Sequence, residues 1–308
     1  MVPENRSFHV GRRKNWKDCP VLVHAAIEIS QSAVRTRVSE FRAEGVDDLI
    51  DRFVPVRASQ ANLDRIAAIV ADGADAARSA GAGPIGLVFT PDLRGTRIAR
   101  LVERRVAPVV SGIRSLEPGA QIACRFMAAT AKLGPEELGE SIGVAGLGHS
   151  SLGIATGRAG EAPRWIGSRP IGLDRVASRA RFQDPPTPVQ LDVARIASGK
   201  SLETMQPPAF ETLLVVSDFE PTLTDLCGAR ASVDDLAGAL GWVLGRTSDE
   251  LSAVTGFDRH LARLLPAAIT IHQALAETFE ATVVAVSPDP AAEAALAELG
   301  STGTARDA

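Results

Sequence analysis

The chain has 308 residues, of which 45% are hydrophobic and 23% charged, and its formal net charge is −4. This composition is typical of a globular protein and excludes a general electrostatic attraction to nucleic acid or to anionic membranes. No apolar run approaches the roughly 20 residues of a membrane-spanning helix. Cys19, Cys124 and Cys227 have no CxxC spacing, which favours reduced thiols and a cytoplasmic location.

The first half of the chain predicts three strands, then alternating helices and strands. After a basic leader at residues 1–19, which we expect to be flexible, the predicted elements cover residues 21–29, 33–41, 49–56, 62–80, 85–90, 96–106, 109–113 and 121–132. Helical spacing of Leu63, Ile66 and Val70 supports the helix at 62–80, and the glycines and proline of 81–84 end it. Three strands followed by alternating helices and strands is the order of a ribonuclease-H-like lobe.

The same order starts again after Gly134-Pro135. Predicted strands cover residues 142–144, 151–156 and 164–171, and further strands at 212–217 and 281–286 are separated by helices, with a last helix at 291–299. The repeat predicts an α/β fold of two ribonuclease-H-like, actin-like lobes with a cleft between them. We place the lobes at residues 20–136 and 137–300, followed by a flexible tail at 301–308.

Each predicted lobe opens with a hairpin that has small residues in its turn. The two hairpins span residues 23–35 and 142–157. Such turns can point backbone amides at an anion, so both are candidate phosphate sites. The candidate phosphate-binding residues are Ser30, Ser32, Arg35, Gly148, His149, Ser150 and Ser151.

The motifs in these hairpins resemble those of a known enzyme family. Residues 28–35 read Glu-Ile-Ser-Gln-Ser-Ala-Val-Arg where the family has Asp-Ile-Gly-Ser-Asn-Ser-Val-Arg. Residues 146–153 read Gly-Leu-Gly-His-Ser-Ser-Leu-Gly where it has Asp-Ile-Gly-Gly-Gly-Ser-Thr-Glu, and the Asp-Pro-Pro-Thr of 184–187 matches a family loop. Over about residues 21–300 the chain therefore resembles the exopolyphosphatase and guanosine pentaphosphate phosphatase (Ppx/GppA) family.

In active members the resemblance implies attack of water on a terminal phosphoryl group, assisted by Mg²⁺ and carboxylates, and pairing into homodimers. Here the first-hairpin Asp and Gly are replaced by Glu28 and Ser30, and the two second-hairpin acids by Gly146 and Gly153. The acid that supplies the family's catalytic base is replaced by Gly119. A glycine-rich turn is replaced by the acidic segment 217–220, and a basic turn by Ser-Pro-Asp-Pro at 287–290. Loss of one such group costs about 10²–10⁴ in rate, so combined loss argues against useful turnover.

Three interpretations follow from these replacements. The first is a non-catalytic pseudophosphatase that binds a phosphate-rich anion weakly or regulates a partner, without Mg²⁺. The second is a divergent hydrolase of polyphosphate or guanosine pentaphosphate, with Glu28 and Glu117 as catalytic groups and Glu28 and Asp218 as Mg²⁺ ligands. The second requires these three carboxylates to converge within about 4–6 Å of a metal-sized space. A small-molecule kinase ranks last, because neither hairpin retains the Asp that holds a metal nucleotide.

Other polar residues give weaker signals. Arg35, Arg94 and Arg169 are further candidates for anion contact. His24 and His272 are predicted core histidines, because they lie in apolar elements. No set of His, Cys, Asp and Glu has the local spacing of a zinc site.

Overall fold

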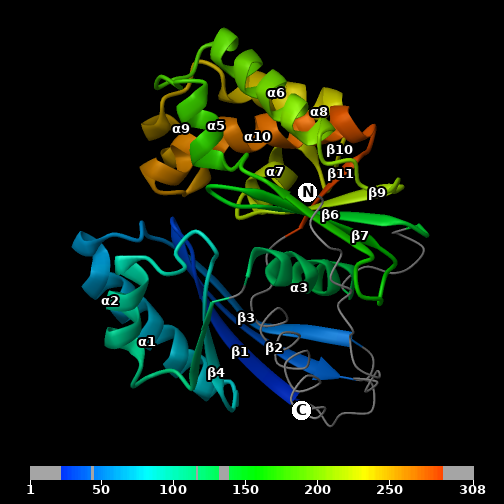
Figure 1. Ribbon diagram of the computed structural model, residues 1–308. Coiled ribbons are helices and arrows are strands. Elements are labelled where there is room, and N and C mark those ends of the chain that lie inside the picture. The colour runs from blue at the N-terminus through cyan, green and yellow to red at the C-terminus, as the bar shows by residue number, and fades with distance from the viewer. Residues whose placement is uncertain (1–21, 43–44, 116, 132–138, 287–308) are drawn as a thin grey trace.

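The computed structural model describes residues 22–42, 45–115, 117–131 and 139–286. These residues form two lobes, each built on one β-sheet (Figure 1). The predicted leader, the tail, the 287–290 turn and the helix at 291–299 lie outside the described residues. Within the part of the chain that is described, no helix combines the length and apolar character needed to cross a membrane.

The first lobe follows the predicted order closely. Its elements are β1 (Leu22–Ile29), β2 (Ala33–Arg42), β3 (Gly45–Pro55), a 3-10 turn (Gln60–Asn62), α1 (Leu63–Ser79), β4 (Ile85–Phe89), α2 (Arg97–Val106), β5 (Gly112–Ser115) and α3 (Pro118–Ala131). The sheet order is β3-β2-β1-β4-β5. Strand β2 is antiparallel to both of its neighbours, β1 and β3, whereas β4 and β5 are parallel to β1. Helices α1 and α2 cover one face of this sheet. Strand β5 begins at Gly112 rather than at residue 109, because its pairing with β4 starts there.

The second lobe repeats this sheet and adds helices. Its elements are β6 (Ile142–Leu147), β7 (Leu152–Gly157), β8 (Trp165–Arg169), α5 (Leu173–Arg179), α6 (Pro188–Glu203), β9 (Thr212–Val216), α7 (Glu220–Cys227), β10 (Arg230–Ala231), α8 (Val233–Val243), α9 (Ser248–Thr255), α10 (Arg259–Phe279) and β11 (Val283–Val286). The strand order of its sheet is β8-β7-β6-β9-β11-β10. The first five strands correspond one by one to β3-β2-β1-β4-β5 of the first lobe, with the same neighbours and the same directions. Strand β10 is an addition at the edge, antiparallel to β11. The predicted internal repeat is therefore confirmed.

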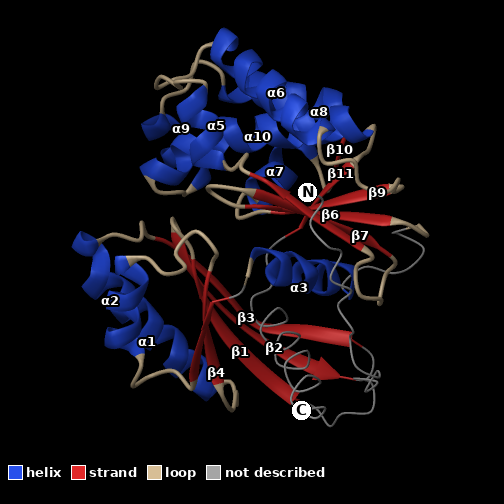
Figure 2. Cartoon of the chain, in the orientation of Figure 1, coloured by secondary structure: helices blue, strands red, loops and turns tan. Residues whose placement is uncertain are grey.

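Helix α3 joins the lobes by packing on the second sheet. Its side chains Ile122, Phe126 and Ala129 form one apolar cluster with residues of β6, β7 and β9. Figure 2 shows the helix lying between the two sheets. The predicted boundary between residues 136 and 137 lies outside the described residues, so it stays a prediction.

The opposite face of the second sheet is covered by the remaining helices, with α10 at their centre (Figure 1). His272 on α10 is fully buried, and its Nδ1 lies 2.7 Å from the carbonyl oxygen of Ala268. Burial lowers the pKa of His272 to about 4, so the ring is neutral at neutral pH. His272 is thus a core histidine, as its apolar helix face predicts.

Candidate functional site

A pocket lies where the two hairpins, α3 and two strand-end loops meet. It is lined by Glu28, Ser30, Thr90, Pro91, Asp92, Pro118, Gln121, Ile122, Arg125, Gly146, Leu147, Gly148, His149, Ser151, Gly153, Ser168, Leu173 and Asp218. We call it the interlobe pocket. Of the candidate site residues from the sequence, the structure brings six to this lining: Glu28, Ser30, Gly148, His149, Ser151 and Asp218.

The turn between β1 and β2, which we call the first turn, is closed by its own serine. The Ser30 hydroxyl oxygen accepts hydrogen bonds from the amides of Ser32, at 3.3 Å, and Ala33, at 3.0 Å. The Ser30 amide in turn donates to the Ala33 carbonyl at 2.9 Å. The hairpin pattern predicted that backbone amides of this turn would donate hydrogen bonds to a bound anion. The Ser32 and Ala33 amides instead donate to the Ser30 hydroxyl within the turn.

The turn between β6 and β7, the second turn, is closed by a carboxylate from the other lobe. Asp92, in the loop after β4, accepts a hydrogen bond from the His149 amide at 3.1 Å and another from the Ser150 hydroxyl. Gly148 permits this approach, because a Cβ there would lie 3.4 Å from the Asp92 carboxylate and 3.2 Å from the Ser151 carbonyl oxygen. An internal anion therefore occupies donors that the hairpin pattern assigns to a phosphate.

His149 uses both ring nitrogens, one toward the first lobe and one within its own lobe. Its Nε2 lies 2.7 Å from Oγ of Ser32, and its Nδ1 lies 3.0 Å from Oδ2 of Asp174 on α5. Ser32 and His149 are both buried. Burial alone would raise the pKa of Asp174, but the hydrogen bond and the charge of His149 outweigh it and lower this pKa.

A second imidazole lies beside this chain of hydrogen bonds. The His260 ring on α10 stacks on the His149 ring at an interplanar angle of 9°, with ring centroids 6.4 Å apart. Burial lowers the pKa of His260. A ring nitrogen of each histidine and a carboxylate oxygen of Asp174 lie within 4.8 Å of one another. The sequence spacing did not indicate this cluster, because its members come from three separate elements.

Glu28 faces a protein cation in the interlobe pocket. Its carboxylate is buried, and Oε2 lies 3.8 Å from an Nη of Arg125 on α3. Oε2 has no hydrogen-bond partner among the described residues. Burial raises the pKa of Glu28, Arg125 opposes that rise, and the Asp218 carboxylate adds to it.

Helix α3 also fills the space beside the second hairpin. A Cβ at Gly146 would lie 3.0 Å from Cδ1 of Ile122 and 3.3 Å from the Arg125 side chain. A Cβ at Gly153 would lie 3.4 Å from Ile122. The glycines that replace the family's acids are therefore matched to the position of α3, and a longer side chain at 146 requires α3 side chains to move.

The remaining candidates lie outside the lining of the interlobe pocket. The Glu117 side chain is 63% exposed and forms an ion pair with Arg94. Arg35 binds Asp51 through two hydrogen bonds of 2.8 and 2.6 Å, and Arg169 donates to Thr204 at 2.8 Å. The three arginines considered for anion contact are thus all engaged with other residues of the chain.

The charged residues of the interlobe pocket fit a Mg²⁺ ion poorly. Mg²⁺ in phosphoryl-transfer sites is held by one or two carboxylates together with substrate oxygens and waters. Here both Asp92 oxygens accept hydrogen bonds, and Glu28 faces the Arg125 guanidinium. This leaves Asp218 as the one carboxylate of the described lining without such a partner, near enough to Glu28 to raise the pKa of that group. The Mg²⁺ role proposed from sequence for Glu28 and Asp218 stays a prediction, and the Arg125 guanidinium that faces Glu28 counts against it.

Sequence reasoning missed Asp92 and Arg125. Asp92 follows β4, which is parallel to β1, so its position at the carboxyl edge of the sheet was a usable signal. No comparable pattern marks Arg125, which reaches the pocket because α3 packs on the other lobe.

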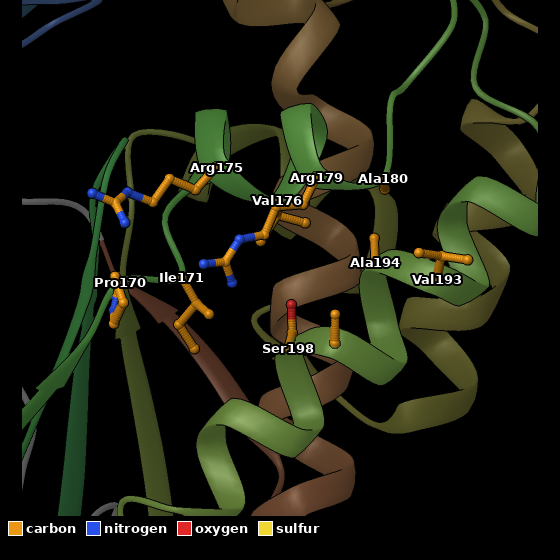
Figure 3. Close-up of a pocket in the computed structure, with 10 residues that line it drawn as sticks. Pro170, Ile171, Arg175, Val176, Arg179, Ala180, Val193, Ala194 and Ser198 are labelled. Atoms are coloured by element: carbon orange, nitrogen blue, oxygen red, sulfur yellow. The ribbon is translucent and has the colours of Figure 1, made fainter.

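A separate, small cavity lies between α5 and α6 (Figure 3). Arg175 and Arg179 extend from α5 along it, and the buried Ser198 hydroxyl has no hydrogen-bond partner among the described residues. None of the candidate site residues lines this cavity, so it is distinct from the interlobe pocket.

No protein-family model matches the sequence, and no curated protein matches it. Solved structures do match over nearly the full length. A Ppx/GppA family member from Aquifex aeolicus superposes with a TM-score of 0.74 at 16% identity, covering 92% of this chain and 99% of that one. An exopolyphosphatase-like protein gives 0.74 at 16% identity, covering 91% and 100%. An exopolyphosphatase from Cytophaga hutchinsonii gives 0.71 at 14% identity, covering 90% and 97%. The chain therefore has the two-lobed, actin-like fold of the Ppx/GppA proteins, which confirms the resemblance at the level of the fold.

Proposed function

We propose that this chain is a non-catalytic, Ppx/GppA-like binding or regulatory protein. The observation that carries the proposal is the Asp92 carboxylate in the second turn, where it accepts the hydrogen bonds of the His149 amide and the Ser150 hydroxyl. A phosphate that enters this turn has to displace an anion that belongs to the protein. Binding of phosphate-rich anions at this site is therefore weak.

Three further observations support the loss of turnover. The Ser30 hydroxyl holds the first-turn amides, so this turn offers fewer donors to a phosphoryl oxygen. Arg125 faces Glu28 where a hydrolase of this kind would use a metal ion. Glu117, the nearest candidate for the missing base, is an exposed side chain paired with Arg94. Phosphoryl transfer depends on positioned charge, and here charged groups of the protein neutralise one another.

By resemblance, the ligand class of this proposal is polyphosphate or guanosine pentaphosphate, and the proposed assembly is a cytoplasmic homodimer. A divergent hydrolase is the second candidate. It is favoured by one observation: Glu28 has a raised pKa, lines a pocket and keeps one oxygen without a hydrogen-bond partner. Such a carboxyl group is a candidate for proton transfer.

Phosphate release separates the two candidates. The wild type, Glu28→Gln and Glu117→Gln are incubated with long-chain polyphosphate or guanosine pentaphosphate, with Mg²⁺ or Mn²⁺. We expect the wild type to release no more phosphate than Glu28→Gln. Metal-dependent release that is lost in Glu28→Gln and kept in Glu117→Gln would establish the hydrolase instead.

Anion binding tests the role of Asp92 directly. We expect Asp92→Ala to bind polyphosphate about tenfold more tightly than the wild type in calorimetry, because it frees the second-turn donors. The matched control is Asp218→Ala, which removes a carboxylate from the same pocket without freeing those donors. Equal gains in both variants would show that general repulsion, not occupation of the turn, limits binding.

A further inference from the structure

We infer that His149, Asp174 and His260 form a binding site for a transition-metal ion of the Zn²⁺ class. Each residue offers one ligand atom, and these atoms lie within 4.8 Å of one another. The Nδ1 atom of His149 and Oδ2 of Asp174 are 3.0 Å apart, a separation compatible with two atoms bound to one ion at about 2.0–2.2 Å each. This inference is independent of the proposed function.

The surroundings of His260 point to a missing partner. Its Nε2 is buried and has no hydrogen-bond partner among the described residues. A buried polar atom is normally satisfied by protein, water or an ion, so an unpartnered imidazole nitrogen beside a second imidazole and a carboxylate calls for a ligand. A cation would meet all three groups together.

His149 is also oriented as metal-bound histidines are. In such sites one ring nitrogen binds the ion while the other donates a hydrogen bond to an oxygen. Here Nε2 lies 2.7 Å from the fully buried Ser32 hydroxyl, which can accept that hydrogen bond. Without an ion, the two ring nitrogens meet Asp174 and Ser32 directly, so the same ring position serves both states.

The donor set selects the metal class. Two imidazole nitrogens and one carboxylate oxygen suit Zn²⁺ and similar ions, whereas Mg²⁺ and Ca²⁺ prefer oxygen ligands throughout. The nearby Arg57 opposes a cation, but its side chain is exposed and its charge is screened by water and salt. The three ligands come from the second turn, α5 and α10, so a bound ion would fix the second turn to the helices of its own lobe.

Metal content and affinity test the site. The full chain is treated with a chelator, desalted and titrated with Zn²⁺, Co²⁺ or Mg²⁺, followed by calorimetry and elemental analysis after gel filtration. We expect one Zn²⁺ per chain, no Mg²⁺ at the same concentration, and visible absorption of bound Co²⁺ typical of a four-coordinate site.

Variants assign the ligands. His260→Gln and the isosteric Asp174→Asn should each weaken Zn²⁺ binding at least about 100-fold, and Ser32→Ala about 10-fold. The control His24→Gln, near the start of β1 and thus at the opposite end of that strand from the first turn, should bind as the wild type does. Circular dichroism of each variant checks the fold. Wild-type protein that retains no Zn²⁺, or folded His260→Gln and Asp174→Asn variants that retain it fully, would overturn the site.

Discussion

The first and second turns occupy equivalent places in the two lobes, one after β1 and one after β6, yet they are closed in different ways. The first turn is closed by Ser30, a residue of the turn itself. The second turn is closed by Asp92 from the other lobe, and Gly172 packs against its backbone. A turn that satisfies its own amides is a local structure. The second turn depends on the lobes lying together, so changes there should have the larger effects.

The largest effect is expected for Gly172→Ala. A Cβ at Gly172 would lie 2.3–2.4 Å from backbone atoms of His149 and Ser150, which cannot move aside as a side chain can. The backbone φ of −92° is open to any residue, so the penalty is steric alone. We expect a loss of about 3–5 kcal/mol in the free energy of unfolding measured with urea.

Gly241→Ala on α8 is the matched control for Gly172→Ala. Nothing lies within 4 Å of a Cβ at Gly241, so the variant should be as stable as the wild type or about 1 kcal/mol more stable. A Gly172→Ala protein of wild-type stability would mean that the second turn can shift away from α5 without loss.

The cores of the lobes differ as well, because the second contains His272 in its apolar interior. The folded pKa of about 4 lies below the ordinary value of 6.5, so the unfolded chain binds more protons between these values. The contribution of a neutral His272 to the free energy of unfolding is therefore fully present above pH 6.5. It is lost as the pH falls toward 4, by about 3 kcal/mol in total. Urea unfolding at a series of pH values measures this loss.

His272→Leu isolates the histidine from the carboxylates that also titrate at acid pH. The difference in stability between wild type and variant should change by about 3 kcal/mol from pH 7 to pH 4. A difference that stays constant over this range would place the acid sensitivity in other groups.

The sequence predicts features that depend on local contacts and misses those that depend on long-range contacts. Strand order, the internal repeat and the hairpins depend on patterns within short segments, and the structure confirms the two-lobed fold. Glu117 looked like a site residue because it lies near the expected base, but α3 begins at Pro118 and Glu117 pairs with Arg94 instead. Asp92 and Arg125 join the pocket only through packing between lobes, and the cluster around His149 draws on three elements. No local pattern encodes such contacts.

A change at Asp92 tests the contact between the first lobe and the second turn. Asp92→Ala removes two charge-assisted hydrogen bonds and leaves the His149 amide without this partner. We expect a loss of about 2 kcal/mol in the free energy of unfolding, together with the tighter polyphosphate binding predicted above. Unchanged stability would show that the second turn keeps its shape without the first lobe.

The smallest effect is expected at the first turn itself. Ser30→Ala removes the oxygen that accepts from the Ser32 and Ala33 amides, but both hydrogen bonds join uncharged groups, unlike those of Asp92. The loss should be about 1 kcal/mol in urea unfolding.

Ser151→Ala is the control for Ser30→Ala. Its side chain lines the same pocket and makes no hydrogen bond within the described structure, so the variant should change stability by less than about 0.5 kcal/mol. If Ser30→Ala instead costs as much as Asp92→Ala, the first turn is not self-contained. Its link to the second lobe, the contact of Ser32 with His149, would then depend on Ser30 holding the turn in shape.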